Sequence, residues 1–220
     1  MKKPNNFKEN IILISAIGMF IYSFIGYVIL PPGTLAPPLK SSFDNNTLFI
    51  ISHAVFSSIA IITGAIQLRR SWREKNPLLN IKLRYIYFIS VLLGSLSGFY
   101  LAFYAYAGFA NIIGYALLAI LWFFTTYLAY KSQKNDDILN YRVWIVRSYA
   151  LTFAAVNLRI YMGLFFIIFG YRQFEYFYAT LGFLCWVPNV VVIEWFYLFP
   201  KVRKKLQKTY KTPSKHSVGV

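Results

Sequence analysis

The sequence predicts an all-α membrane protein, a bundle of six transmembrane helices. Of its 220 residues 58% are apolar and 14% are charged, and the mean hydropathy is +0.50, whereas a soluble domain is about 45–50% apolar and about a quarter charged. Six stretches of about 20 mostly apolar residues are long enough to cross the hydrocarbon as helices. Transmembrane β-strands are excluded because they are about half as long and alternate in polarity.

The span boundaries follow from these stretches and from the turn residues between them. In chain order we expect helices over Asn10–Leu30, Thr47–Leu68, Tyr85–Tyr106, Phe109–Tyr130, Ser148–Gly170 and Tyr176–Phe199. Pro and Gly residues fall at the breaks, as expected of turns, at Pro31, Gly33, Pro77, Gly108 and Pro200. The chain therefore divides into an N-terminal segment, a transmembrane domain and a basic tail, over residues 1–9, 10–199 and 200–220.

The charge is unevenly distributed along the chain. Its 23 Lys and Arg residues against 7 Asp and Glu residues give a formal net charge of +16. That excess alone would suggest a protein that binds nucleic acid. The apolar composition, however, leaves too little polar surface for a soluble fold, so we expect no nucleic-acid partner. Twenty of the basic residues lie in the N-terminal segment, the second and fourth loops and the tail. The positive-inside rule therefore places both termini in the cytoplasm, and the expected partners are the bilayer and anionic lipid headgroups at the basic loops and tail.

Small residues at four-residue spacing mark the helix faces that pack against each other in lipid. Ser90, Gly94 and Gly98 form such a stripe on the third span, and Gly64 shares a face of the second span with His53. We expect these small residues to serve helix packing.

Two ionisable side chains, His53 and Arg159, lie on such faces and should point into the protein. Ionisable residues inside a membrane are costly and are candidates for functional sites. Arg159 lies eleven residues past Ser148, about 16 Å above the inner end of its span at 1.5 Å per residue. Asn189 reaches a matching depth on the sixth span, so it is the expected partner. We assign five residues to a ligand-binding or buried polar centre: His53, Arg159, Asn189, Tyr100 and Asn157.

Glu194 is the one acidic residue well inside a predicted span. It lies only about 7 Å above the inner end of the sixth helix, a depth that suits Arg147 or Arg142. We expect a structural ion pair between Glu194 and Arg147. A pair between Glu194 and Arg159 would require the sixth helix to be broken near Pro188.

Several motifs of enzymes and metal proteins are missing. The sequence has no Walker-type Gly-rich loop, no paired-histidine metalloprotease motif and no Gly-x-Ser-x-Gly elbow. With two histidines and the single cysteine Cys185, a structural zinc site is not expected. We predict no metal site and favour a protein that is not an enzyme.

Parts of the chain resemble a family of bacterial membrane proteins known as a numbered domain of unknown function (DUF2306). The resemblance covers about residues 50 to 195 and is strongest over Trp144–Arg159, with similar segments at Gly64–Leu68 and Trp186–Trp195. It implies a multi-pass protein of the bacterial cytoplasmic membrane with undetermined activity. It also places five residues at typical family positions: His53, Arg147, Arg159, Asn189 and Glu194.

The chain departs from this family at two positions. Many relatives carry His where this chain has Asn80 and Tyr141, in a pattern similar to di-haem cytochromes of the b561 type. Because this chain has one intramembrane histidine, His53, two axial haem ligands cannot come from one subunit. We therefore predict no cofactor, with haem disfavoured.

Three functions remain open. The favoured one is a non-enzymatic protein that binds a small molecule, or lets it pass, at the polar centre around His53 and Arg159. The second is a redox protein that uses haem or a quinone, with His53 as ligand or proton donor. The third is a scaffold or assembly factor whose polar residues only fix helix packing.

Overall fold

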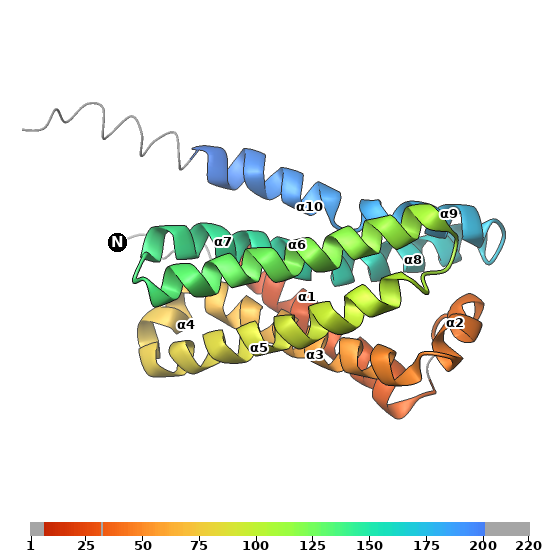
Figure 1. Cartoon of the computed structure of the whole chain (residues 1–220), viewed down its shortest axis with the longest axis horizontal. Helices are drawn as coiled ribbons and strands as arrows, with labels where there is room; N and C mark the ends of the chain where they lie inside the picture. Colours follow the sequence, from red (N-terminus) through yellow and green to blue (C-terminus); the bar gives the residue numbers. More distant parts are fainter. Residues whose placement is uncertain (1–6, 32, 201–220) are drawn as a thin grey trace, which may run out of the picture.

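The computed structural model describes residues 7–31 and 33–200, and every regular element in this part of the chain is a helix (Figure 1). Six helical segments are long and apolar enough to span a membrane, which confirms the predicted fold class: Glu9–Ile29, Thr47–Leu68, Pro77–Ala102, Phe109–Lys134, Ile138–Phe169 and Phe174–Leu198. The predictions for Lys2, Lys3 and the tail from residue 201 onward fall outside the described residues.

Three of the spans contain more than one helix. The spans consist of α1 (Phe7–Phe24) with the π-helix η1 (Ile25–Ile29), α3 (Thr47–Leu68), α5 (Pro77–Ala102), α6 (Phe109–Lys134), α7 (Ile138–Thr152) with α8 (Ala154–Phe169), and α9 (Phe174–Leu184) with α10 (Val187–Val192) and the π-helix η3 (Ile193–Leu198). Short helices connect them: η2 (Pro37–Leu39), α2 (Lys40–Asp44) and α4 (Arg70–Lys75).

The helices of two predicted spans, the third and the fifth, have other boundaries than expected. The third helix begins at Pro77 and ends at Ala102, not at Tyr85 and Tyr106. Hydropathy reports which residues lie in lipid, whereas the helix itself starts where a proline occupies its first turn. The fifth span likewise begins ten residues early, at Ile138, because Asp137 caps its first turn by accepting a hydrogen bond from a backbone N–H.

The sixth span is interrupted between α9 and α10. Cys185 and Trp186 separate the two helices, and Pro188 lies in the first turn of α10. Proline has no N–H to donate to the carbonyl four residues earlier, so the helical hydrogen-bond ladder breaks at this point.

The helices pack side by side with their loops at two opposite ends. α3 lies against α5 and against α1, and α6 lies between α5 and α7 (Figure 1). We call the end that carries α4 and the α6–α7 turn the basic end, because Arg69, Arg73 and Lys134 lie there. The opposite end carries η2, α2 and the α5–α6 and α8–α9 turns, and we call it the capped end.

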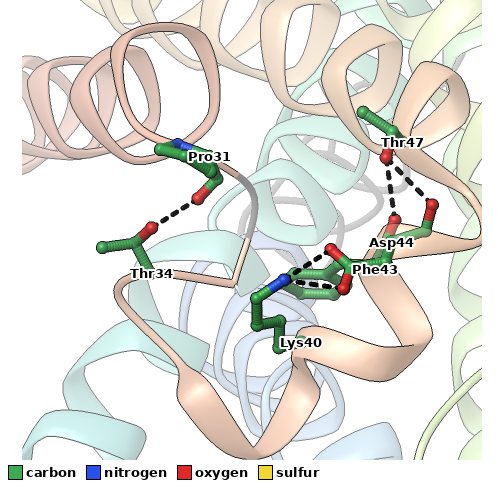
Figure 2. A network of polar contacts seen from close by, with 6 residues as sticks. All are labelled: Pro31, Thr34, Lys40, Phe43, Asp44 and Thr47. Atoms are coloured by element: carbon green, nitrogen blue, oxygen red, sulfur yellow. Dashed lines mark hydrogen bonds and ion pairs between the residues drawn. The ribbon is translucent and has the colours of Figure 1, made fainter.

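Residues 33–46, which we call the cap, fold over the second end. Figure 2 shows its polar contacts: Lys40 Nζ lies 2.7 Å from Asp44 Oδ2, and the Thr34 hydroxyl donates to the Pro31 carbonyl at 2.7 Å. Leu39 is 1% exposed and packs in an apolar cluster with residues of α8 and α9. The Ser42 hydroxyl donates to the Tyr104 carbonyl at 2.8 Å, which ties the cap to the α5–α6 turn.

A buried hydrogen-bond network joins α5, α6 and α7. The Tyr87 hydroxyl lies 2.7 Å from Ser148 Oγ and 2.9 Å from Thr152 Oγ1. Trp122 Nε1 donates to Thr152 Oγ1 at 2.8 Å, and Thr126 Oγ1 lies 2.6 Å from Ser148 Oγ. In an apolar medium such polar groups need partners from neighbouring helices, so this network fixes how the three helices fit together.

Asn111 performs a similar task between α6 and α9. Its side chain is fully buried and donates to the carbonyls of Tyr106 and Tyr178 at 2.8 and 2.9 Å. It also accepts from the Gly182 backbone N–H at 2.8 Å. The two helices touch closely here, because a Cβ on Gly114 would lie 2.5 Å from the Gly182 carbonyl.

Tyr87→Phe tests the contribution of the network to stability. We expect a loss of about 1 kcal/mol, because two hydrogen bonds disappear while Ser148 and Thr152 keep their other partners. The measurement is reversible unfolding in detergent, with Tyr85→Phe as control, since Tyr85 is 49% exposed on the same helix. Equal stability of the two variants would contradict this role.

Candidate functional site

A cavity of about 230 Å³ lies in the half of the bundle nearest the cap. All six spans contribute to its wall, and the cap contributes Leu39, Ser42 and Phe43. The wall is mainly aliphatic and aromatic, with a small number of polar side chains, which is the usual composition of a small-molecule site. The space is several times the roughly 30 Å³ that one water molecule occupies in the liquid.

His53 reaches this cavity from α3. Its Nδ1 lies 2.8 Å from the Gly94 carbonyl of α5. Because a carbonyl oxygen can only accept, Nδ1 carries the proton and donates it. Among the described residues, the hydrogen-bonding atom recorded near Nε2 is Ser57 Oγ, at 3.5 Å. The imidazole is thus held by one strong hydrogen bond and keeps a second nitrogen available to the cavity.

The predicted packing glycines make room for side-chain rings. A Cβ on Gly98 would lie 2.8 Å from the His53 ring, and one on Gly94 would lie 3.1 Å from the Trp122 ring. On α3, a Cβ on Gly64 would lie 2.4 Å from the Tyr149 ring. Ser90, the fourth predicted packing residue, is buried on the same helix as Gly94 and Gly98.

Arg159 lies on the same cavity wall, on α8. It is ten residues before the end of the helix at Phe169, which is about 15 Å along the axis and therefore near the middle of a bilayer. Its Nη2 donates to the Tyr27 hydroxyl, and its Nη1 lies 3.6 Å from the Met162 sulfur. The guanidinium also lies over the Tyr22 and Tyr27 rings, 5.2 and 5.6 Å from their centres. Its Nε is buried and has no hydrogen-bond partner among the described residues.

The expected pairing of Arg159 with Asn189 was wrong. Asn189 donates to the Ala150 carbonyl at 3.0 Å and accepts from Asn157 Nδ2 at 2.6 Å, and both amides also lie 3.4 Å from the Cys185 carbonyl. The Cys185 carbonyl lies at the interruption of the sixth span, whereas the Ala150 carbonyl belongs to α7. Matching depth therefore did not identify the partner of Arg159, which is Tyr27 of the first span.

Tyr100 also lies away from the cavity wall. Its ring stacks on that of Phe49, with centres 3.8 Å apart, and its hydroxyl donates to the Tyr104 hydroxyl at 3.4 Å. Of the five residues assigned to the polar centre, the structure thus brings His53 and Arg159 to one cavity and places the other three elsewhere.

Glu194 accepts two hydrogen bonds from Arg147, with distances of 2.5 Å from Nε to Oε1 and 3.0 Å from Nη2 to Oε2. Both side chains are partly exposed, and the Arg147 guanidinium also lies over the Trp144 ring. The sixth span is broken near Pro188, yet the break does not bring Glu194 to Arg159.

Sequence reasoning missed several aromatic residues of the cavity. Tyr27 and Tyr178 line it, and so does Tyr115, whose hydroxyl is buried beside Tyr178. With 18 tyrosines in the sequence, an inward-facing one carries no distinguishing signal. A lone His or Arg in a span does carry such a signal.

The side chains around the cavity offer hydrogen-bond donors and one guanidinium. Within residues 7–31 and 33–200, no three His, Cys, Asp or Glu side chains gather as metal ligands would. Cys185 lines the cavity but is buried and unpaired. The Ser57–His53 distance of 3.5 Å exceeds the roughly 2.6–3.2 Å reach of an activated nucleophile and its base.

Gly98→Ala tests whether the stripe on α5 holds the His53 ring. The new methyl group would lie 2.8 Å from that ring, so we expect a destabilisation of about 1–3 kcal/mol and a changed imidazole NMR signal. The control is Gly163→Ala, because no atom lies within 4 Å of the added Cβ there. Identical unfolding curves and an unmoved imidazole signal in both variants would contradict this assignment.

The family model described as "Predicted membrane protein (DUF2306)" matches residues 50–197. That range includes His53, Arg159, the three complete spans that follow α3 and all but the last residue of the sixth span, whereas Tyr22, Tyr27 and the cap precede it. Comparisons with curated proteins and with solved structures found no match. The chain belongs to the DUF2306 family of predicted membrane proteins.

Proposed function

We propose that this protein binds a small molecule in the cavity between His53 and Arg159. The observation that carries the proposal is that two ionisable side chains deep inside the spans, His53 and Arg159, lie on one cavity wall, although they come from α3 and α8. A bundle that only needed to pack would gain nothing from a cavity lined by polar groups that lack partners.

The tight packing toward the basic end favours the binding of a small molecule over its passage through the bundle. The cavity draws on residues near the capped ends of α3, α5 and α6, from Ile50 to Ser58 and from Gly94 to Trp122. Toward the basic end, the core contains Ala60, Ile61 and Tyr87, each 0–1% exposed. A solute would therefore have to displace the hydrogen-bond network around Tyr87 to cross the bundle.

We place the protein in the bacterial cytoplasmic membrane as a multi-pass protein, with the basic end in the cytoplasm. The positive-inside rule supports this orientation, because the cap has a single basic residue, Lys40, and it is paired with Asp44. We also propose that the basic end contacts anionic lipid headgroups. Lys75, Lys82 and Lys134 support this, because each of these basic side chains is exposed at that end of the bundle.

A ligand screen by thermal unfolding tests the proposed binding. A compound that binds the native state raises the unfolding temperature, and we expect Ala155→Phe to abolish that shift because Ala155 lines the cavity. Ala110→Phe is the matched control, since Ala110 is exposed on α6 and away from the cavity. If no compound stabilised the protein, or if Ala155→Phe responded like the control, a scaffold role would be the better account.

A redox function has one observation in its favour. Histidines that bind metals usually donate their other ring N–H to a carbonyl or carboxylate, as His53 does to Gly94. The chain's only other histidine is His216, which lies in the tail outside the described residues. We therefore propose that the protein carries no haem. The absorption spectrum of protein purified from its native membrane should lack a Soret band. A stoichiometric band that disappears in His53→Ala would establish the redox alternative instead.

A further inference from the structure

The cavity wall carries a positive charge without a negative one. All seven Asp and Glu residues of the chain lie in the described residues, and none of them lines the cavity. Glu194 is paired with Arg147, and Asp44 is paired with Lys40. Arg159 is therefore without a carboxylate partner near the middle of the membrane, where an uncompensated charge is most costly.

The contacts that Arg159 does make use only part of its hydrogen-bonding capacity. A guanidinium has five N–H donors. One of them goes to the Tyr27 hydroxyl, one points to the weakly accepting sulfur of Met162, and Nε–H has no partner. The tyrosine rings beside the guanidinium offset some of its charge, but they do not take the place of hydrogen-bond acceptors for its N–H groups. The guanidinium therefore has more hydrogen-bond donors than the surrounding side chains have acceptors for.

A second donor lies on the same wall. The Tyr115 hydroxyl is buried beside the Tyr178 side chain, and both tyrosines line the cavity. A tyrosine hydroxyl and a guanidinium can both donate to a group that accepts through several lone pairs. A carboxylate does this, because its two oxygens accept about four hydrogen bonds.

The rest of the cavity wall is apolar and suits a hydrocarbon group of a ligand. Side chains such as Leu101, Leu118, Leu151 and Leu158 make up much of the wall, together with the face of Trp122. An inorganic anion bound at Arg159 would leave these surfaces without a partner. A ligand with an apolar body would bury them and gain about 25 cal/mol for each Å² of apolar surface removed from water.

We infer that the ligand of this cavity is a small organic monoanion, a carboxylate on an apolar body, with the carboxylate at Arg159 and the body against the leucines and Trp122. This inference rests on the proposed function, since it specifies the chemistry of the same site. The ligand supplies the negative charge that the chain itself does not place on the wall.

The test compares three probes of the same length on the intact protein. Hexanoate is ionised at neutral pH, hexanamide is neutral and hexylammonium is cationic. The protein is reconstituted in nanodiscs of zwitterionic phosphatidylcholine, so that no anionic lipid competes. We expect hexanoate to raise the unfolding temperature, and the amide and the ammonium to bind about tenfold or more weakly. Sodium chloride alone should give no comparable shift.

Variants assign the preference to Arg159. Arg159→Gln should weaken hexanoate binding about tenfold or more, whereas Arg142→Gln, an exposed arginine at the basic end, should not. Tyr27→Phe removes the main partner of Arg159 and keeps the charge, so it should retain the preference for hexanoate over hexanamide. If Arg159→Gln does not fold, the three-probe comparison and Tyr27→Phe still decide the matter.

The outcomes separate the two proposals. Equal stabilisation by hexanoate and hexanamide, or hexanoate binding that survives Arg159→Gln, would overturn the inference that the ligand is an anion bound at Arg159. The proposal that the cavity binds a small molecule would still stand. If chloride stabilised the protein as much as hexanoate, the inference that the ligand has an apolar body would be overturned. If neither these probes nor any compound of the wider screen stabilised the protein, the proposed function itself would fail.

Discussion

A guanidinium about 15 Å from the nearer end of its membrane span needs compensation, and in this bundle the protein supplies it without a carboxylate. Arg159 has the Tyr27 hydroxyl as its main hydrogen-bond partner and two tyrosine rings beside it. All of these come from the first span, so the position of α1 against α8 depends on this contact. The same arrangement leaves one side of the guanidinium directed to a cavity, and the character of the site follows from that.

The two halves of the bundle solve the problem of polar groups in lipid differently. Toward the basic end, Tyr87, Ser148 and Thr126 satisfy one another and leave no space. Toward the cap, the guanidinium of Arg159 is left partly unsatisfied beside a cavity. Because unsatisfied buried polar groups cost free energy, the second arrangement is best understood as a site completed by a ligand.

The sequence was sufficient for the fold and for the identity of the central residues. Apolar stretches located all six spans, and the rarity of ionisable residues in a span singled out His53 and Arg159. Depth along the helices selected Arg147 for Glu194, and the structure joins these two side chains. These features depend on composition and on distance along one helix, which a sequence contains.

What the sequence could not supply depends on how helices are rotated and interrupted. Asn189 was expected at Arg159, but its amide donates to the Ala150 carbonyl of α7 and lies near the Cys185 carbonyl at the interruption of its own span. Tyr27 was missed because its contact with Arg159 joins positions 132 residues apart. The cap lies outside the predicted spans, yet it places Leu39 and Phe43 on the cavity wall.

The most direct test of this account is an experimental density map of the protein purified from its own membrane with no ligand added. The account predicts elongated density in the cavity, in contact with the guanidinium of Arg159 at one end and with Trp122 and the leucines along its length. A map in which Arg159 is paired with a carboxylate of the chain, or in which the cavity holds only ordered water, would contradict it.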